Sequence, residues 1–369
     1  MPRPHAIFSP SEPVGDHFRA AVSSAITAFL DERAEELSAI GPELAAPMEL
    51  ARVFTSGGKR LRPAFCWWGR VATGGDPVDP VGMMQVAASL DLLHVSALMH
   101  DDVMDSSDTR RGVAAAHRQF EQLHVQREGR GSGEAFGRAG AILLGDLLLV
   151  WSEQMMSRSG LHVATLERGR PIVEAMRSEV TCGQFLDVIA QSAPESHDLE
   201  QALERANRIV EFKTNRYTVQ RPLQFGAALG GATAVQLDQL AAFASPIGRA
   251  FQFRDDLLGV FGDQKLTGKP AGDDLREGKR TVLVAHALAK ASAAASAELE
   301  SMLGNEALDA AQVERAREII VTSGARDAVE NTIEAGYAQA MDALSKADVT
   351  EEGRVALGNL ATASVRRVF

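Results

Sequence analysis

The sequence predicts an all-helical protein. Apolar residues recur at intervals of three and four along most of the 369 residues, and the alternation typical of strands is scarce. Alanine and leucine are abundant, and aromatic residues make up only 5% of the chain. Glycine- and proline-rich breaks such as TGGDPVDP and TGKPAGDD separate the periodic segments. We find no convincing linker and no fixed-period repeat, so we expect one domain over residues 1–369.

The expected helices follow one another along the chain with short breaks. Apolar periodicity and breaker residues place them at 16–39, 43–55, 61–73, 79–105, 134–157, 162–191, 198–215, 218–230, 233–262, 280–302 and 311–345. Residues 1–15 contain several prolines and lack the apolar run of a signal peptide, so they are expected to form a flexible arm. The segment HVQREGRGSGEAFG, residues 124–137, is expected to be a mobile surface loop.

Composition excludes several classes of protein. The formal net charge of -11 argues against a nucleic-acid binder, which needs a basic face to displace counterions from phosphates. The two cysteines, Cys66 and Cys182, lie far apart, which argues against a disulfide framework or a cysteine zinc site and favours the cytoplasm. No stretch reaches the roughly 18 uninterrupted apolar residues of a membrane span. The nearest approaches, at 81–99 and 140–151, are interrupted by charged residues.

Residues 98–112, LMHDDVMDSSDTRRG, carry the first acidic cluster. In a helix, Asp101 and Asp105 lie one turn apart on the face that also holds His94 and Ala97, with Asp102 beside them. Ligation by oxygen alone selects a hard ion, and Mg²⁺ bound through a few carboxylates keeps positions for substrate phosphates. The alternative is a solvated acidic helix end, because 49 acidic residues make about one chance match to this spacing expected.

A second acidic cluster lies in FQFRDDLLGVFGDQKLTGKPAGDDLREGKRT, residues 251–281. Asp255 and Asp256 sit in an apolar helix, where unpaired carboxylates are costly, and Gln252 can share their face. A glycine-rich loop follows, with Asp263, Asp273 and Asp274 punctuated by Lys269 and Lys279. Taken alone, this cluster is as compatible with a structural role as with a metal site.

Basic residues form two further groups. GGKRLRP, residues 57–63, places two glycines before Lys59, Arg60 and Arg62 at a helix start, an arrangement that suits an anionic oxygen cluster. Arg110 and Arg111 form the other group. A short basic run by itself is more often a solvated face. Together with the two acidic clusters, however, these groups describe a cavity for two phosphorylated substrates, with apolar helix faces for a hydrocarbon tail.

At these residues the sequence resembles the trans-isoprenyl diphosphate synthases, the polyprenyl synthetase family. GGKRLRP, HDDVMDSSDTRRG, KTNRY at 213–217 and the segment 251–281 resemble its motifs in its order, over roughly residues 45 to 290. The resemblance implies an all-α helical bundle of the isoprenoid synthase type with a central cavity. It also implies a homodimer.

The resemblance also assigns roles to the residues that match. Magnesium, three ions per active site, would be held by Asp101 and Asp105 with Asp102 nearby, and by Asp255 and Asp256 on the opposite wall. Isopentenyl diphosphate would contact Lys59, Arg62, His94 and Arg111, with Gly58 allowing close backbone approach. The allylic diphosphate would contact Arg110, Lys213, Lys269 and Lys279, and the developing cation would lie near Thr214 and Gln252.

One position departs from the family pattern. The second motif is often written with a third aspartate, and Gly259 stands in that place. Two explanations stay open: Asp263, one turn further on, substitutes for the missing carboxylate, or the two remaining aspartates suffice.

The activity implied is condensation of isopentenyl diphosphate with an allylic diphosphate (dimethylallyl, geranyl or farnesyl) by ionisation, addition and proton loss. We find no nucleophile elbow or catalytic triad, and this chemistry requires neither. The growing tail would run back along the helix from Asp101, and each turn covers roughly 5.4 Å, about one isoprene unit. Ser96 and Ala97 leave that path open one turn down, which predicts a product of at least twenty carbons, geranylgeranyl diphosphate first.

Four alternatives remain at this stage. A farnesyl diphosphate synthase and a longer-chain polyprenyl synthase differ from the main prediction only in product length. A class I terpene cyclase needs no second diphosphate site, so the basic clusters count against it. A catalytically silent partner subunit is expected to have lost residues from the first aspartate motif, which is complete here.

Overall fold

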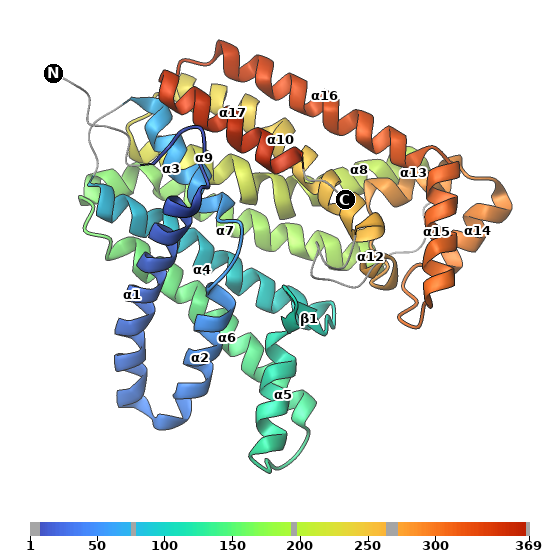
Figure 1. Ribbon diagram of the computed structural model, residues 1–369, viewed down its shortest axis with the longest axis horizontal. Helices are drawn as coiled ribbons and strands as arrows, with labels where there is room; N and C mark the ends of the chain where they lie inside the picture. The colour runs from blue at the N-terminus through green and yellow to red at the C-terminus, as the bar shows by residue number, and fades with distance from the viewer. Residues whose placement is uncertain (1–7, 75–78, 193–197, 263–271, 367–369) are drawn as a thin grey trace. The chain divides into compact units, whose positions relative to one another are not determined.

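The all-helical prediction is confirmed. A computed structural model describes residues 8–74, 79–192, 198–262 and 272–366, and helices dominate them (Figure 1). The α-helices are α1 Asp16–Ile40, α2 Ala45–Thr55, α3 Leu61–Thr73, α4 Pro80–Met104, α5 Ala116–Gln126, α6 Gly133–Ser157, α7 Val163–Ser192, α8 Leu199–Ile209, α9 Arg221–Leu229, α10 Ala234–Phe261, α12 Asp273–Arg276, α13 Val282–Lys290, α14 Ala293–Met302, α15 Ala310–Thr322, α16 Ala325–Lys346 and α17 Glu351–Val365. A 3₁₀ turn, η1 Pro42–Leu44, and a π-helix, η2 Val210–Gln220, complete the helical elements.

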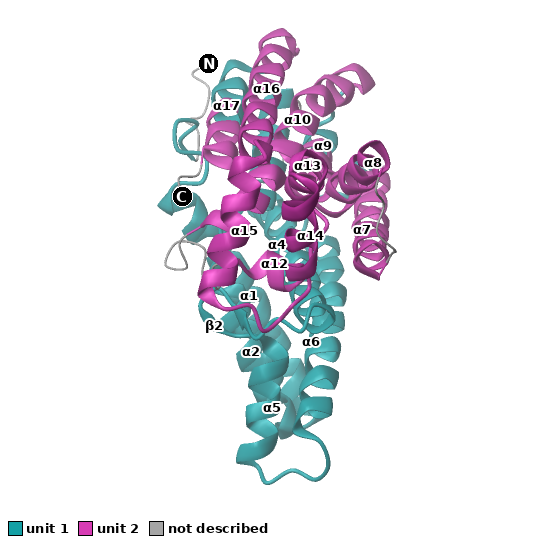
Figure 2. Cartoon of the chain, turned by 90° about the vertical axis from the view of Figure 1, so that its right-hand side faces the viewer, with its two compact units in different colours: residues 1–169, 226–232, 350–357 teal, residues 170–225, 233–349, 358–369 magenta. Residues whose placement is uncertain are grey.

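The chain divides into two compact units, each assembled from several segments (Figure 2). Unit 1 comprises residues 1–169, 226–232 and 350–357, and unit 2 comprises 170–225, 233–349 and 358–369. The single-domain organisation stays a prediction. The first aspartate motif and GGKRLRP belong to unit 1, whereas KTNRY and the second aspartate motif belong to unit 2.

Unit 1 is organised around α4, which packs against α1, α3 and α6. Asp79 caps its start, accepting hydrogen bonds from the amides of Val81 (3.0 Å) and Gly82 (3.1 Å). Both α4 and α6 are long and apolar enough to span a membrane by length and composition alone. Of the most apolar 18-residue stretch in each helix, 72% is buried inside the protein in α4, as expected for a core helix, and 39% in α6.

Unit 2 is organised around α10, which packs against η2 and α16. The helix begins with a reciprocal capping box between Thr233 and Gln236. A π-helix is rare and is found most often at functional sites, because its wider turn changes the direction of neighbouring side chains. Here it carries Lys213 and Thr214, two of the predicted site residues.

Several expected elements differ from the structure. The helix expected at 198–215 changes to π geometry at Val210. The stretch 280–302 breaks between Lys290 and Ala293, where Ser292 caps the next helix, and 311–345 breaks at Gly324, which has a positive φ of 74°. Helices α5, α12 and α17 and a short hairpin, β1 Thr109–Arg110 with β2 Val113–Ala114, were not expected.

Two expected flexible segments are shorter than the sequence suggested. Only residues 127–132 of the predicted loop 124–137 lie outside helices. In the predicted arm 1–15, Phe8 makes edge-on ring contacts with Phe18 and Trp67, both at 5.1 Å. The carbonyl of Pro13 accepts a hydrogen bond of 3.0 Å from the indole of Trp68. These contacts tie the second half of the arm to α1 and α3.

Candidate functional site

The first aspartate cluster occupies the last turn of α4. Asp101 and Asp102 lie in the helix, and Asp105 is its C-cap residue. The backbone N–H of Asp105 donates to the carbonyl of Asp101 at 2.8 Å. Asp102 is almost fully buried, whereas Asp101 and Asp105 are half-buried. The two half-buried carboxylates are one turn apart and therefore share a helix face.

A two-residue hairpin sends the two consecutive arginines to different neighbours. Arg111 and Gly112, between β1 and β2, both have positive φ (54° and 79°), as a type I′ turn requires. The guanidinium of Arg110 contacts Asp102, with Nε at 2.8 Å from Oδ1, and lies 3.7 Å from Asp101. Arg111 instead donates to the carbonyls of Gly57 (3.1 Å) and Phe54 (3.4 Å).

The GGKRLRP segment joins α2 to α3 and meets Arg111 at Gly58. Gly58 has φ 115°, and a Cβ there would lie 3.0 Å from Nη2 of Arg111, so glycine allows both the backbone conformation and the close approach. Lys59 is exposed and Arg62 is half-buried. Arg60 is only 3% exposed and its charge is matched by Asp91. The expectation that Arg60 offers charge alongside its neighbours is therefore wrong.

His94 lies on α4 in a strongly positive environment. Its pKa is lowered well below 6.5, first by burial and then by the charges of Arg62, Arg111, Arg110 and Arg60. Burial also lowers the pKa of Arg111, and three of the same arginines act in the same direction. A neutral imidazole among several guanidinium groups marks a site whose positive potential suits an anion with multiple charges.

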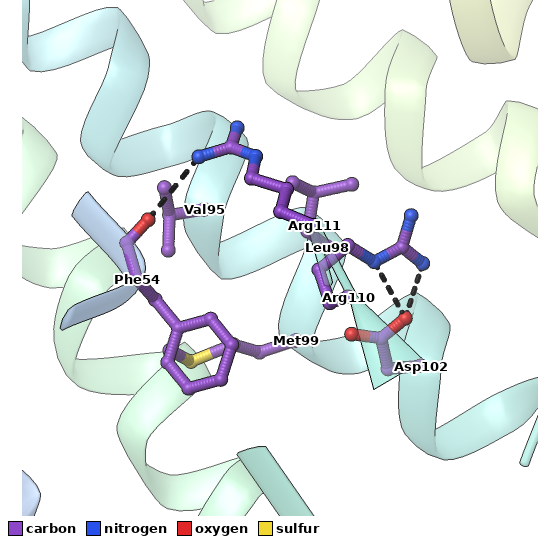
Figure 3. Close-up of a pocket in the computed structure, with 7 residues that line it drawn as sticks. All are labelled: Phe54, Val95, Leu98, Met99, Asp102, Arg110 and Arg111. Carbon is purple, nitrogen blue, oxygen red and sulfur yellow. Dashed lines mark hydrogen bonds and ion pairs between the residues drawn. The ribbon is translucent and has the colours of Figure 1, made fainter. Parts of the chain in front are cut away.

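A small pocket lies between α2, the end of α4 and the hairpin (Figure 3). Its apolar wall and its polar rim are formed by Phe54, Val95, Leu98, Met99, Asp102, Arg110 and Arg111. Figure 3 shows the two guanidinium groups diverging from adjacent positions in the chain, one toward Asp102 and the other toward the Phe54 carbonyl. The pocket thus combines an apolar surface with two separately oriented cations.

In unit 2, a chain of hydrogen bonds joins η2 to the second aspartate motif. The Thr214 hydroxyl donates to Oε1 of Gln252 at 2.5 Å, and the Gln252 amide donates to Oδ1 of Asp256 at 2.7 Å. Gln252 and Asp256 are one turn apart on α10. We expected Gln252 to share a helix face with the aspartates, and its bond to Asp256 confirms this for Asp256.

Asp256 is buried among other carboxylates. Burial raises its pKa from the ordinary 3.8 to about 8, with further increases from Asp274 and Asp255, while the bond from Gln252 and the charge of Lys279 oppose the shift. A bound cation would favour the ionised form of such a buried carboxyl group.

Asp274 occupies the space beside Gly259. A Cβ built on Gly259 would lie 1.9 Å from Oδ2 of Asp274, so only glycine leaves room for that carboxylate against α10. Lys279 lies 3.4 Å from the other oxygen of Asp274 and also contacts Glu277. The structure thus places a carboxylate from α12 at the position where the family motif usually has its third aspartate. Asp263, the substitute considered from sequence, lies outside the described residues, as does Lys269.

Comparison with known proteins assigns the chain to a family. The family model for polyprenyl synthetase matches residues 44–320. The chain belongs to the polyprenyl synthetase family. A short chain isoprenyl diphosphate synthase of Methanothermobacter thermautotrophicus is 32% identical over 276 residues, which is 74% of this chain and 77% of that protein. A geranylfarnesyl diphosphate synthase of Aeropyrum pernix is 30% identical over 90% of this chain and 96% of its own length.

A solved structure shares the whole fold of this polyprenyl synthetase. It is a geranylgeranyl pyrophosphate synthase from Corynebacterium glutamicum in complex with isoprenyl diphosphate and magnesium. The two chains are 39% identical with a TM-score of 0.91, over 96% of this chain and 99% of the other. The protein is therefore a trans-isoprenyl diphosphate synthase with the all-α fold of that family, as its motifs predicted.

The structure also adds residues to this synthase's candidate site that sequence reasoning missed. Asp187 on α7 lies 2.5 Å from the Lys213 amino group and is 7% exposed. Lys213, which is predicted to bind the allylic diphosphate, therefore has a buried carboxylate as its partner. The two are 26 positions apart and no local pattern connects them. The sequence presents Asp274 only as a loop residue, because its contact with Gly259 depends on tertiary structure.

Proposed function

We propose that this synthase condenses isopentenyl diphosphate with an allylic diphosphate to form geranylgeranyl diphosphate. The observation that carries the proposal is the divergence of Arg110 and Arg111. Arg110 lies against the carboxylates of Asp101 and Asp102. Arg111 lies beside the glycine loop, residues 56–60 between α2 and α3. Two cationic groups with different surroundings fit two diphosphates, one held together with a metal and the other held directly.

The residues present fit magnesium. The donors on α4 and α10 are carboxylate oxygens, which suit a hard cation, and a bound cation would favour ionisation of Asp256, whose pKa is raised chiefly by burial. Among the described residues no three acidic, histidine or cysteine side chains form a ready-made cage. Mg²⁺ commonly takes one or two carboxylates plus waters and substrate phosphates, so none is required. We assign three ions per active site to Asp101 and Asp105 and to Asp255 and Asp256, with Asp274 near the second pair.

Each side chain then has a defined task. Lys59, Arg62, His94 and Arg111 bind the diphosphate of isopentenyl diphosphate, and Arg110, Lys213, Lys269 and Lys279 bind the allylic diphosphate. Asp187 orients the Lys213 amino group through its 2.5 Å contact. Thr214 and Gln252, joined by a hydrogen bond, present oxygen dipoles where the allylic cation develops. Bound magnesium supplies positive charge to the departing diphosphate.

The bond changes follow from this arrangement. The allylic C–O bond breaks, the double bond of isopentenyl diphosphate attacks the resulting cation, and a proton is lost to form the new double bond. The released diphosphate is a base already in place to take that proton. Positioning and electrostatics supply the catalysis, so no nucleophilic side chain is needed.

Product length is proposed from the helix that precedes the first aspartates. Ala97 is half-buried one turn before Asp101, and Ser96 is 3% exposed. Neither side chain is bulky, which supports a tail of twenty carbons or more. Several relatives carry names for that product, including a geranylgeranyl diphosphate synthase of Saccharolobus solfataricus that is 31% identical over 73% of this chain.

We further propose a cytoplasmic homodimer. Ile142, Leu143, Leu149 and Val150 of α6 are 43%, 63%, 39% and 51% exposed and recur on one helix face. This largely apolar face, which also carries the exposed Asp146, is typical of an interface, and we propose that a second copy of the chain covers it. Both cysteines are free thiols, as is usual in a reducing compartment.

Release of diphosphate from farnesyl diphosphate, measured with and without isopentenyl diphosphate, tests the proposed function. A synthase releases diphosphate only when isopentenyl diphosphate is present. Release without it, accompanied by a cyclic hydrocarbon, would instead establish a terpene cyclase. A silent partner subunit would show no release under either condition.

A further inference from the structure

Arg60 is the member of GGKRLRP that turns away from solvent. It is 3% exposed, it precedes α3 in a left-handed conformation with φ 52°, and its guanidinium makes three bonds. Nη1 donates to Oδ2 of Asp91 at 2.6 Å, and Nη2 donates to the Thr55 carbonyl at 2.8 Å and to the Ser23 hydroxyl at 3.0 Å. One side chain therefore ties the ends of α2 and α3 to α1 and α4.

Asp91 is the anchor of this arrangement on α4. It is 5% exposed, and it lies three residues before His94, so the two are neighbours on the helix surface. Its charge raises the pKa of Arg111, in opposition to burial and to the neighbouring arginines. A buried carboxylate so close to an anion site would repel the anion unless a cation matched it, and Arg60 provides that cation.

The segment between α2 and α3 is thus held from two sides. Arg60 binds the Thr55 carbonyl, and Arg111 binds the carbonyls of Phe54 and Gly57. Both arginines have positive φ, a conformation that persists only where surrounding contacts determine it. The exposed residue Lys59, which directly precedes Arg60, is carried on backbone that these contacts fix.

We propose that Arg60 and Asp91 are positioning residues that hold the glycine loop in the geometry needed for isopentenyl diphosphate, without contacting that substrate themselves. The proposal rests on the proposed function. It assigns Arg60 a role distinct from those of Lys59 and Arg62, although all three belong to one basic run. Loss of the pair should weaken isopentenyl diphosphate binding selectively.

The test uses the double variant Arg60→Met/Asp91→Leu, because removing both partners avoids leaving an isolated buried charge. Arg60→Lys is the second variant: it keeps the charge but cannot reach Asp91, Thr55 and Ser23 together. The matched control is Arg33→Met. Arg33 is also a buried arginine of unit 1, 2% exposed and paired with Glu36 at 3.0 Å, but it lies in α1 away from the loop.

Steady-state kinetics with varied isopentenyl diphosphate and varied farnesyl diphosphate give the first measurement. Both Arg60 variants are expected to raise KM for isopentenyl diphosphate about tenfold or more, the scale of a small misplacement of binding groups. The KM for farnesyl diphosphate should stay within about twofold. Equal changes in the two KM values, or a KM for isopentenyl diphosphate equal to that of Arg33→Met, would overturn the proposal.

Amide hydrogen exchange by mass spectrometry gives a measurement independent of turnover. Amide hydrogens in the peptide covering residues 55–60 should exchange faster in both Arg60 variants than in the wild type. Their exchange rate should be unchanged in Arg33→Met. Unaltered exchange in that peptide would also overturn the proposal. If the wild-type chain incorporates no isopentenyl diphosphate, the proposed function fails. If the wild type is active and the Arg60 variants have the same kinetics and the same hydrogen exchange as the wild type, only the positioning proposal fails.

Discussion

The carboxylate of Asp274 lies where the side chain of an aspartate at position 259 would otherwise extend, 1.9 Å from the place of a Cβ on Gly259. Gly259 thus replaces the third aspartate of the family motif, and the carboxylate of Asp274 fills the space where that side chain would lie. Glycine at 259 leaves the Asp274 carboxylate in its place, whereas an aspartate at 259 would displace it.

Restoring the third aspartate should therefore do harm. Gly259→Asp is expected to push α12 away from α10 and to lower the free energy of unfolding by about 1–3 kcal/mol, the usual cost of overpacking. Magnesium affinity should fall as well. Thermal unfolding and calorimetric titration with MgCl₂ check both effects. The matched variant Gly259→Asp/Asp274→Ser removes the collision and should recover most of the stability. A more stable Gly259→Asp protein with tighter magnesium binding would show that Asp274 does not fill this space.

The aspartates of α4 should be needed for turnover far more than for folding. Asp101→Asn and Asp105→Asn are each expected to lower kcat by about 10²–10³, as for loss of one electrostatic catalytic group. Both are half-buried at the helix end, so the thermal midpoint should change little. Asp108→Asn is the control, because that side chain is 71% exposed and pairs with Arg118 at 2.7 Å. Equal losses in all three variants would remove the special role of the first two.

The raised pKa of Asp256 predicts how stability and magnesium binding depend on pH. Its pKa rises from 3.8 to about 8 on folding, so its protonation stabilises the folded state fully below about pH 4, and this contribution is lost as pH rises toward 8. In EDTA, the wild type should lose more stability between pH 5 and pH 8 than Asp256→Asn, which has no such group. Magnesium competes with the proton, so its affinity should rise with pH up to about 8 in the wild type. Parallel unfolding curves for the two proteins across this range would contradict the assignment.

Ala97 should set the depth available to the growing tail. Ala97→Phe places a ring one turn before Asp101 and is expected to shift the product toward fifteen carbons, with turnover of dimethylallyl diphosphate retained. Reversed-phase chromatography of the dephosphorylated products measures the shift. Ser96→Phe tests a position that is only 3% exposed, where a ring also costs stability by overpacking. An unchanged product from Ala97→Phe would place the floor of the tail pocket elsewhere.

Periodicity and motifs predicted much of this molecule. The boundaries of α3 matched the expected helix at 61–73, and those of α4 and α10 came within one residue, because these segments are long and strongly apolar and have clear breaks. The motifs also assigned magnesium to both aspartate pairs, and that assignment stays a prediction. The two arginines that follow the first pair were assigned to different diphosphates, and the hairpin does separate their side chains.

The remaining features depend on contacts between distant parts of the chain. The burial of Arg60 results from Asp91, 31 positions away, and local sequence gives it the same appearance as its exposed neighbour Lys59. The π geometry of η2 likewise leaves no mark in apolar periodicity. The hairpin was missed because its strands have two residues each, too few for an alternating pattern.

Incorporation of labelled isopentenyl diphosphate into product tests the central claim most directly. The purified chain is incubated with farnesyl diphosphate, labelled isopentenyl diphosphate and MgCl₂, and the dephosphorylated product is separated by chain length. The account predicts a labelled twenty-carbon prenyl alcohol as the main product and none when EDTA replaces magnesium. Absence of label from every prenyl product, while farnesyl diphosphate is consumed, would contradict it.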